Sequence, residues 1–254
     1  MNDIRDNLAA SLARIEAEIA AACQAAGRPR SEVELMAVSK VHPSPMMVEA
    51  VSLGLHLFGE NRVQEFAEKS AQLSVSRNPG VEQTARSQMQ VHLIGHLQSN
   101  KAAKAIEVFD AIDSLDSLKL AERLDEAAAK NDRWKGKRLP VLLEIKLSHE
   151  ETKEGIAPDS TELAELLEKL PSLKHLEVQG LMTIAPFGVP EEETRACFRA
   201  LRDLRDKLAQ SHPRLNLPVL SMGMSGDFAL AIAEGATRIR VGTALFGKRP
   251  GYAQ

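Results

Sequence analysis

Residues 34–40 read Glu34-Leu35-Met36-Ala37-Val38-Ser39-Lys40, a short apolar run that ends in one lysine and is followed by Val41-His42-Pro43. A run of this length that stops before a proline predicts a buried strand, so Lys40 stands where a strand passes into a loop. In one interpretation its ammonium merely reaches solvent from the strand end. In the other, Lys40 is a nucleophile whose lowered pKa lets the amine attack an aldehyde and hold it as a Schiff base.

The same alternation of short apolar runs and helical periodicity continues along the chain. Eight strands are expected, over residues 34–40, 55–58, 90–94, 108–112, 139–147, 176–182, 219–221 and 238–241. Helical patterns separate them, with starts near 44, 63 and 100 and with the ranges 117–130, 160–170, 191–210 and 225–234. Eight such units in about 250 residues predict a single α/β domain, a (β/α)₈ TIM barrel. An open doubly wound sheet is the alternative, but no GxGxxG follows the first strand.

Helical spacing also marks the beginning of the chain, where residues 4–26 predict an additional N-terminal helix. We therefore expect one domain over 1–254, with that helix preceding a barrel over about 34–247. The first residues are polar and acidic, unlike a signal peptide, and no apolar run approaches membrane-spanning length. We expect a cytoplasmic protein that does not bind membranes.

Composition excludes several classes of protein. The chain of 254 residues is 44% hydrophobic and carries a formal net charge of −3 from well-mixed acidic and basic residues, without a basic block. Nucleic-acid binding is therefore disfavoured. The two cysteines, Cys23 and Cys197, lie far apart and lack CxxC spacing. Neither a disulfide framework nor a metal site is expected.

Two glycine-containing loops follow the last two predicted strands, where barrels bind phosphate. The first is Ser221-Met222-Gly223-Met224-Ser225-Gly226-Asp227 and the second is Gly242-Thr243-Ala244. Backbone N–H groups at two helix starts, with the hydroxyls of Ser225 and Thr243, can hold a phosphate dianion. In the alternative, Ser225 is only a helix N-cap and Gly242 a turn glycine.

Arg240 lies two residues before Gly242 and shares a strand face with Arg238. An arginine that points into a barrel needs an acceptor, which a heteroaromatic nitrogen could supply. The alternative is an ion pair with Glu144 or Asp227, which remains plausible for Arg238. With Lys40 and the two loops, Arg240 completes a three-point site for pyridoxal 5′-phosphate: aldehyde, ring nitrogen and phosphate.

Six stretches of the chain carry a family resemblance. They are Ala37-Val38-Ser39-Lys40, the run 58–65 (FGENRVQE), the run 92–101 (HLIGHLQSNK), Gly180-Leu181-Met182-Thr183-Ile184, the run 220–225 (LSMGMS) and Arg240-Val241-Gly242-Thr243. In this order the chain resembles the YggS/PROSC family of pyridoxal phosphate homeostasis proteins from about Met36 to Gly247. One departure is Val91, where many members have tryptophan.

The resemblance implies an alanine-racemase-like barrel of fold type III and assigns roles to residues. Lys40 would be the Schiff-base lysine, Arg240 would face the pyridine nitrogen, and Ser225, Gly242 and Thr243 would hold the phosphate. Two further cofactor contacts are implied, Asn61 near the ring and Met222 in the run 220–225. A monomer is expected, with apo-enzymes that require pyridoxal phosphate as possible recipients.

The same residues argue against strong catalysis. An arginine keeps its proton, so a ring nitrogen that faces Arg240 is a poor electron sink. Racemases of this barrel class add a β-rich domain and a tyrosine base, whereas the one tyrosine here is Tyr252. The histidines His92, His96 and His149 could act as bases, but packing or capping roles are as common.

We therefore expect a carrier that masks a reactive aldehyde, with no catalytic residues. An amino-acid racemase remains the alternative. A Schiff-base aldolase is a second one, because Lys146 near the end of the fifth strand is another candidate nucleophile.

Overall fold

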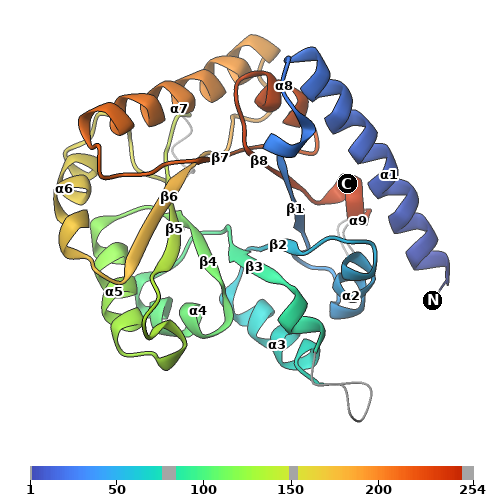
Figure 1. The fold of residues 1–254 in the computed structure, drawn as a ribbon, viewed down its shortest axis with the longest axis horizontal. Helices are drawn as coiled ribbons and strands as arrows, with labels where there is room; N and C mark the ends of the chain where they lie inside the picture. Colours follow the sequence, from blue (N-terminus) through green and yellow to red (C-terminus); the bar gives the residue numbers. More distant parts are fainter. Residues whose placement is uncertain (1, 76–83, 149–153, 248–254) are drawn as a thin grey trace.

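The computed structural model describes residues 2–75, 84–148 and 154–247, and in it eight parallel strands close into one barrel (Figure 1). Each strand pairs with the next along the chain, and β8 pairs with β1. The strands are β1 (Glu34–Val38), β2 (Leu57–Glu60), β3 (Gln90–Leu93), β4 (Ala111–Leu115), β5 (Leu139–Glu144), β6 (Leu176–Met182), β7 (Val219–Met224) and β8 (Arg238–Val241). The predicted (β/α)₈ barrel is confirmed.

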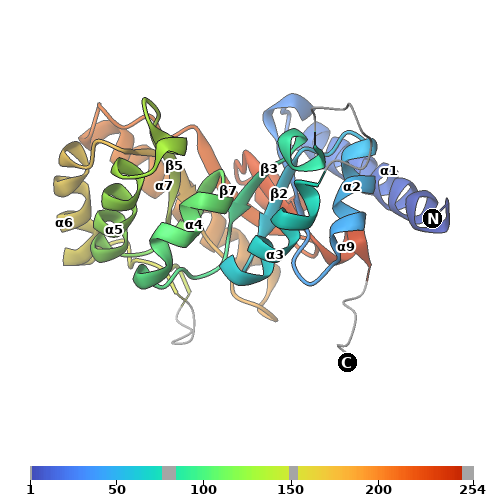
Figure 2. The same cartoon turned by 90° about the horizontal axis from the view of Figure 1, so that it is seen from below.

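Helices form a ring around the barrel (Figures 1 and 2). They are α1 (Asn2–Ala25), α2 (Ser44–Ser52), α3 (Val63–Leu73), α4 (Ala102–Val108), α5 (Leu118–Ala129), α6 (Thr161–Lys169), α7 (Glu191–Ser211), α8 (Phe228–Ala233) and α9 (Thr243–Phe246). Among the described residues, no helix combines the length and the apolar character that crossing a membrane requires.

Most expected elements lie near their predicted positions, although β2 runs two residues later than the expected 55–58 and β7 extends to Met224, beyond the expected 219–221. The fourth strand differs most. It was expected over 108–112, whereas Val108 ends α4 and β4 runs from Ala111 to Leu115. The apolar residues Val108 and Phe109 belong to the helix end and the connection after it. Asp113 consequently lies inside the strand instead of ending it, and its side chain is 1% exposed.

The main hydrophobic core lies between the barrel and the surrounding helices. Alternate strand residues such as Ala37, Leu143 and Ile239 are fully buried there, as expected for parallel strands covered by helices. The barrel interior is smaller and more polar. Met36, Val38 and Ile94 form a separate apolar cluster within it.

A charged cluster fills the part of the interior nearer the amino ends of the strands. Arg238 pairs with Glu34 at 2.8 Å and with Asp113 at 3.3 Å, and His92 Nδ1 lies 2.9 Å from Asp113 Oδ1. Burial alone would raise the pKa of Asp113, but His92 and Arg238 outweigh it and hold that pKa below 3.8. The ion pair that remained plausible for Arg238 occurs, but its partners are Glu34 and Asp113 and not the suggested Glu144 or Asp227.

The N-terminal helix is confirmed as α1, which packs against α8 and α9. Ile15 and Ile19 are fully buried in this contact layer. The Arg14 guanidinium donates to the carbonyl oxygen of Ala244 in α9 at 3.1 Å. The first helix therefore supports the loop after β8.

Candidate functional site

A cavity of about 540 Å³ opens at the carboxyl ends of the strands. Chemically active side chains reach it from strands on opposite sides of the barrel, which is where TIM barrels place their sites. Its lining comprises Val38, Lys40, Asn61, Ile94, Gly95, His96, Glu144, Ile145, Lys146, Leu147, Ser148, Glu154, Ile184, Phe187, Met224, Ser225, Gly226, Arg240, Gly242 and Thr243.

Lys40 follows β1 and lines this cavity together with Asn61, which follows β2. The Lys40 ammonium lies 3.4 Å from Asn61 Oδ1, a long contact for a hydrogen bond. The next residue, Val41, has φ of 62°. A β-branched residue rarely adopts this left-handed conformation, and such strain collects at functional sites.

A buried network holds this turn in place. The Lys69 ammonium on α3 donates to Glu60 Oε1 at 2.8 Å, to Glu65 Oε1 at 2.7 Å and to the carbonyl oxygen of Ser39 at 3.0 Å. Glu65 Oε1 also accepts the Val41 backbone N–H at 2.6 Å. The strained residue is thus tied through α3 to the neighbouring strand β2.

Glu60 is the deepest member of the network and is fully buried. Its Oε1 accepts from Lys69 and from the Ser39 hydroxyl, while Oε2 has no hydrogen-bond partner among the described residues. Burial raises the pKa of Glu60, and Lys69 and Ser39 oppose this only in part.

Arg240 points from β8 into the barrel and is 4% exposed. Its Nη1 donates to the carbonyl oxygen and the hydroxyl of Ser221, and its Nη2 donates to the carbonyl oxygen of Thr183, each at 2.8 Å. These bonds use three of the five guanidinium N–H donors. The predicted alternative, an ion pair, does not occur with any described carboxylate, so Arg240 lines the cavity with donors to spare.

The loops after β7 and β8 follow neighbouring strands, and both line the cavity. The backbone N–H groups of Ser225, Gly226, Thr243 and Ala244 donate to no acceptor among the described residues. The hydroxyls of Ser225 and Thr243 likewise have no described partner. Such a set of unused donors suits an anion with several oxygens, as a phosphate has.

The local conformation explains these unused donors. Asp227 occupies the N-cap position of α8 and accepts the Met224 N–H at 2.5 Å, so Ser225 is not the helix cap. Gly223 has φ of 92°, and a Cβ there would lie 2.6 Å from the Cβ of Ala231. The turn that presents Ser225 therefore requires glycine at this position.

The opposite wall of the cavity is acidic. Glu144 ends β5 and is 6% exposed, and burial followed by Asp116 raises its pKa to about 7. His96 Nδ1 lies 2.7 Å from Asp116 Oδ2 and 3.9 Å from Glu154 Oε2. Lys146 also lines this wall. From the sequence, Glu144 was expected only as a possible ion-pair partner, although its position as the charged residue at the end of an otherwise apolar strand is a signal for a site residue.

The structure brings six of the predicted cofactor contacts to the cavity and leaves one elsewhere. Those brought together are Lys40, Asn61, Ser225, Arg240, Gly242 and Thr243. Met222 is fully buried in the core between barrel and helices, and Met224 lines the cavity in its place. His92 belongs to the interior charge cluster, while His149 and Tyr252 lie outside the described residues.

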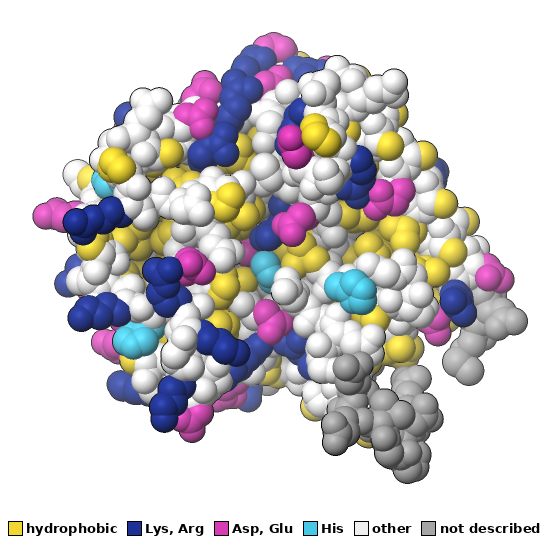
Figure 3. Space-filling view, in the orientation of Figure 1, with side chains coloured by type: hydrophobic (Ala, Val, Ile, Leu, Met, Phe, Trp, Pro, Cys, Tyr) yellow, Lys and Arg dark blue, Asp and Glu magenta, His cyan; other side chains and the backbone are white. Residues whose placement is uncertain are grey.

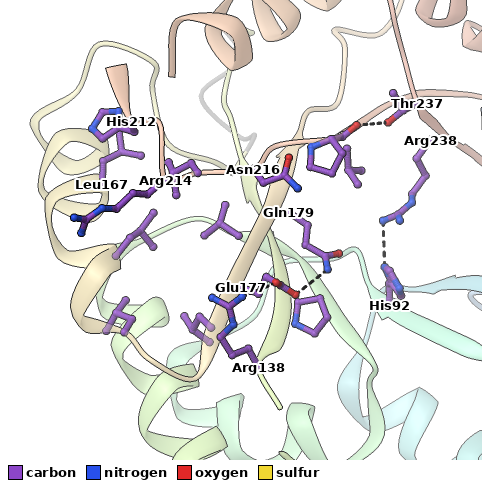
Figure 4. A pocket seen from close by; sticks show the side chains of 18 of the residues that line it. His92, Arg138, Leu167, Glu177, Gln179, His212, Arg214, Asn216, Thr237 and Arg238 are labelled. Atoms are coloured by element: carbon purple, nitrogen blue, oxygen red, sulfur yellow. Dashed lines mark hydrogen bonds and ion pairs between the residues drawn. The ribbon is translucent and has the colours of Figure 1, made fainter. Parts of the chain in front are cut away.

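A larger cavity, of about 1330 Å³, lies at the amino ends of the strands. Figure 3 shows hydrophobic side chains exposed on the left of this face, and Figure 4 shows Arg138, His212 and Arg214 around the hollow. At its inner end Arg238 meets His92 (Figure 4), and both already interact with Asp113. The smaller cavity is the candidate site, because among the described residues it brings together a strand-end lysine and unused donors.

Residues 10–250 match the family described as "Alanine racemase, N-terminal domain". Among curated proteins, the chain is 40% identical to the pyridoxal phosphate homeostasis protein of Aquifex aeolicus, over 96% of this chain and 99% of that one. It is 39% identical to the protein of that name from Vibrio cholerae, over 98% of each chain.

Solved structures agree with this similarity. PipY of Synechococcus elongatus with PLP bound is 42% identical, with a TM-score of 0.76 over 94% of this chain and 100% of that one. An alanine racemase of Clostridium difficile is 16% identical, with a TM-score of 0.68 over 97% of this chain but 57% of that one. The second likeness concerns the fold alone.

Proposed function

Because this chain belongs to the pyridoxal phosphate homeostasis protein family, within the alanine racemase N-terminal domain family, we propose that it binds pyridoxal 5′-phosphate and keeps it in a releasable form. The observation that carries the proposal is the convergence of Lys40, Arg240 and the donor-rich loops on one cavity. When bound, the cofactor supplies an aldehyde that condenses with a primary amine.

Each described group has a distinct task in this proposal. Lys40 offers the amine, and Asn61 accepts from its ammonium. Arg240 directs its remaining N–H donors at a ring-nitrogen acceptor. Ser225 and Thr243 bind the phosphate with their hydroxyls and backbone N–H groups, and Gly242 lets the loop approach. Met222 would contribute only through the conformation of its loop.

We propose a carrier without strong turnover. Arg240 cannot donate a full proton to the ring nitrogen, which weakens carbanion stabilisation. The described lining of the cavity contains no tyrosine that could serve as a second base. The protein would act in the cytoplasm as a monomer and pass the cofactor to apo-enzymes.

Chemical trapping tests the assignment of the lysine. The protein loaded with pyridoxal phosphate is reduced with borohydride, digested and analysed by mass spectrometry. We expect the adduct on Lys40 and its loss in Lys40→Ala. An adduct on Lys146, which lines the same cavity, or on Lys101 would instead contradict the assignment to Lys40.

Activity measurements separate the carrier from a racemase. Each acid–base group is typically worth about 10²–10⁴-fold, so a site lacking one base should turn over slowly. We expect reactivation of an apo-transaminase by the loaded protein and no racemisation detectable by chiral chromatography. Turnover near ~1–10³ s⁻¹ on any amino acid would instead establish an enzyme.

A further inference from the structure

The acidic wall of the cavity gathers more potential metal ligands than the cofactor requires. Nδ1 of His96 and carboxylate oxygens of Asp116 and Glu154 all lie within 4.8 Å of one another. His96 and Glu154 are half exposed, whereas the Asp116 side chain is 9% exposed. An ion could therefore enter from solvent and reach a ligand fixed in the protein.

Glu144 is a second, independent feature of this wall. It is 6% exposed, and no described residue forms a hydrogen bond or salt bridge with its carboxylate, although Arg240 and His96 attract its charge from further away. Leu143 of β5 pairs with Leu115 of β4, so Glu144 stands beside Asp116, and it lines the same cavity as His96 and Glu154. A buried carboxylate with no direct partner binds either a proton or a cation, which offsets the cost of its charge.

We propose that this wall is a divalent metal site that Zn²⁺ fits, with His96, Asp116 and Glu154 as ligands and with Glu144, which lies outside that close group, as the fourth ligand after its side chain turns toward the ion. One imidazole with carboxylates suits a borderline ion, and four ligands suit a tetrahedral one. Bonds of about 2.0–2.2 Å place ligand atoms roughly 3–3.5 Å apart. The distances of 2.7 and 3.9 Å from His96 Nδ1 bracket that range, so small side-chain movements suffice.

Charge balance explains why an ion belongs there. Zn²⁺ would take the position of the proton shared between His96 Nδ1 and Asp116, and that proton would pass to solvent. Three carboxylates face one imidazole, the Arg240 guanidinium is engaged with Ser221 and Thr183, and the Lys146 ammonium on the same wall supplies one positive charge against three carboxylates. The site stands independently of the proposed cofactor, because none of its ligands is among the groups assigned to pyridoxal phosphate.

Zinc titration of the cofactor-free, EDTA-treated and desalted protein tests this site by calorimetry. We expect one Zn²⁺ per chain, and affinity about 100-fold lower in His96→Gln and in Glu154→Gln, because even outer residues of metal sites are worth 10–100-fold. Glu144→Gln should weaken binding by about 10-fold. Circular dichroism checks that each variant is folded.

A matched control is His175→Gln. His175 Nδ1 lies 3.4 Å from Asp125 Oδ2 with exposure similar to that of His96, but no described third ligand joins this pair. We expect zinc binding by this variant to equal that of the parent. The proposal would be overturned if His96→Gln bound zinc as tightly as the parent, or if His175→Gln lost as much zinc affinity as His96→Gln. If Glu144→Gln bound zinc as tightly as the parent, Glu144 would not be the fourth ligand.

Discussion

Val41 carries a backbone conformation that its side chain disfavours, directly after the proposed cofactor lysine. Its φ of 62° is the one positive value at a non-glycine residue in the described chain. The bond from its N–H to Glu65 holds it there. The turn therefore stores strain that a smaller hydrogen-bonding residue would relieve.

Replacing Val41 by asparagine should stabilise the protein by about 1 kcal/mol, because asparagine tolerates the left-handed region and Val41 is 39% exposed. Urea unfolding measures the change in free energy. Val75→Asn is the control, since Val75 is 67% exposed and has no positive φ. If Val41→Asn were less stable than the parent, the backbone at Val41 would not be strained as inferred.

Arg240→Lys should weaken pyridoxal phosphate binding by about 10–100-fold, the equivalent of losing one hydrogen bond to a charged group, roughly 1.5–3 kcal/mol. Lysine keeps the charge but loses the planar fork that reaches Ser221, Thr183 and the cavity together. Titration followed by visible absorption measures it. Arg238→Lys, which alters the interior pairs only, should retain the affinity and the spectrum of the parent.

At the scale of elements, α3 connects two strand ends through one buried ammonium. Lys69 reaches Glu60 at the end of β2 and the carbonyl oxygen of Ser39 beyond β1. Removing one member of a buried pair leaves the other charge uncompensated. The position of the Lys40 turn thus depends on a helix that contributes nothing to the cavity lining.

Lys69→Met should destabilise the protein by about 3–5 kcal/mol at pH 8. The effect depends on pH because burial raises the pKa of Glu60 above its ordinary 4.5 in the folded state. The stability that protonated Glu60 contributes is fully present below pH 4.5. It is lost as the pH rises through the pKa that Glu60 has in the folded protein. The loss caused by Lys69→Met should therefore grow as the pH rises above the folded pKa of Glu60, which itself lies above 4.5.

Urea unfolding at several pH values measures this trend. Lys104→Met is the control, because the Lys104–Glu107 pair is exposed and should be worth less than about 1 kcal/mol at every pH. Adding Glu60→Gln to Lys69→Met should restore much of the stability. If the destabilisation caused by Lys69→Met did not change with pH, Glu60 would not be the charge that the substitution leaves uncompensated.

At the scale of the whole molecule, closure of the barrel depends on close backbone contact between β6 and β7. Gly180 pairs with Val219, and a Cβ at Gly180 would lie 1.9 Å from the Val219 carbonyl oxygen. Backbone on both sides would have to move. Because each strand pairs with two others, an opening here leaves edges that the closed barrel does not have.

Gly180→Ala should therefore lower the stability of the entire chain, by more than about 3 kcal/mol, or prevent folding. If residues 1–254 form one domain, as we propose, the fluorescence of Trp134, on the connection before β5, and the circular dichroism should be lost together. Gly226→Ala is the folding control, since its Cβ would meet no atom within 4 Å. Separate transitions for the two signals would contradict a single domain.

The sequence by itself determined the repeating plan and predicted the main residues of the proposed site. Apolar runs at 139–147 and 238–241 carry the strand period, and Lys40 and Arg240 stand at strand ends where the closed barrel collects side chains. These are local properties, because strand periodicity and the order of the elements can be recognised in the sequence without knowing which residues are in contact. The N-terminal helix could be predicted from the sequence for the same reason.

Only the tertiary structure decided which groups meet. Met222 was expected at the cofactor and lies in the outer core, because one residue of strand register reverses the face of a side chain. The fourth strand was misplaced because Val108 and Phe109 read as strand until packing made them a helix end. His96, Asp116, Glu144 and Glu154 converge from separate loops and strands, and such convergence is set by the closing of the barrel, which linear spacing does not contain.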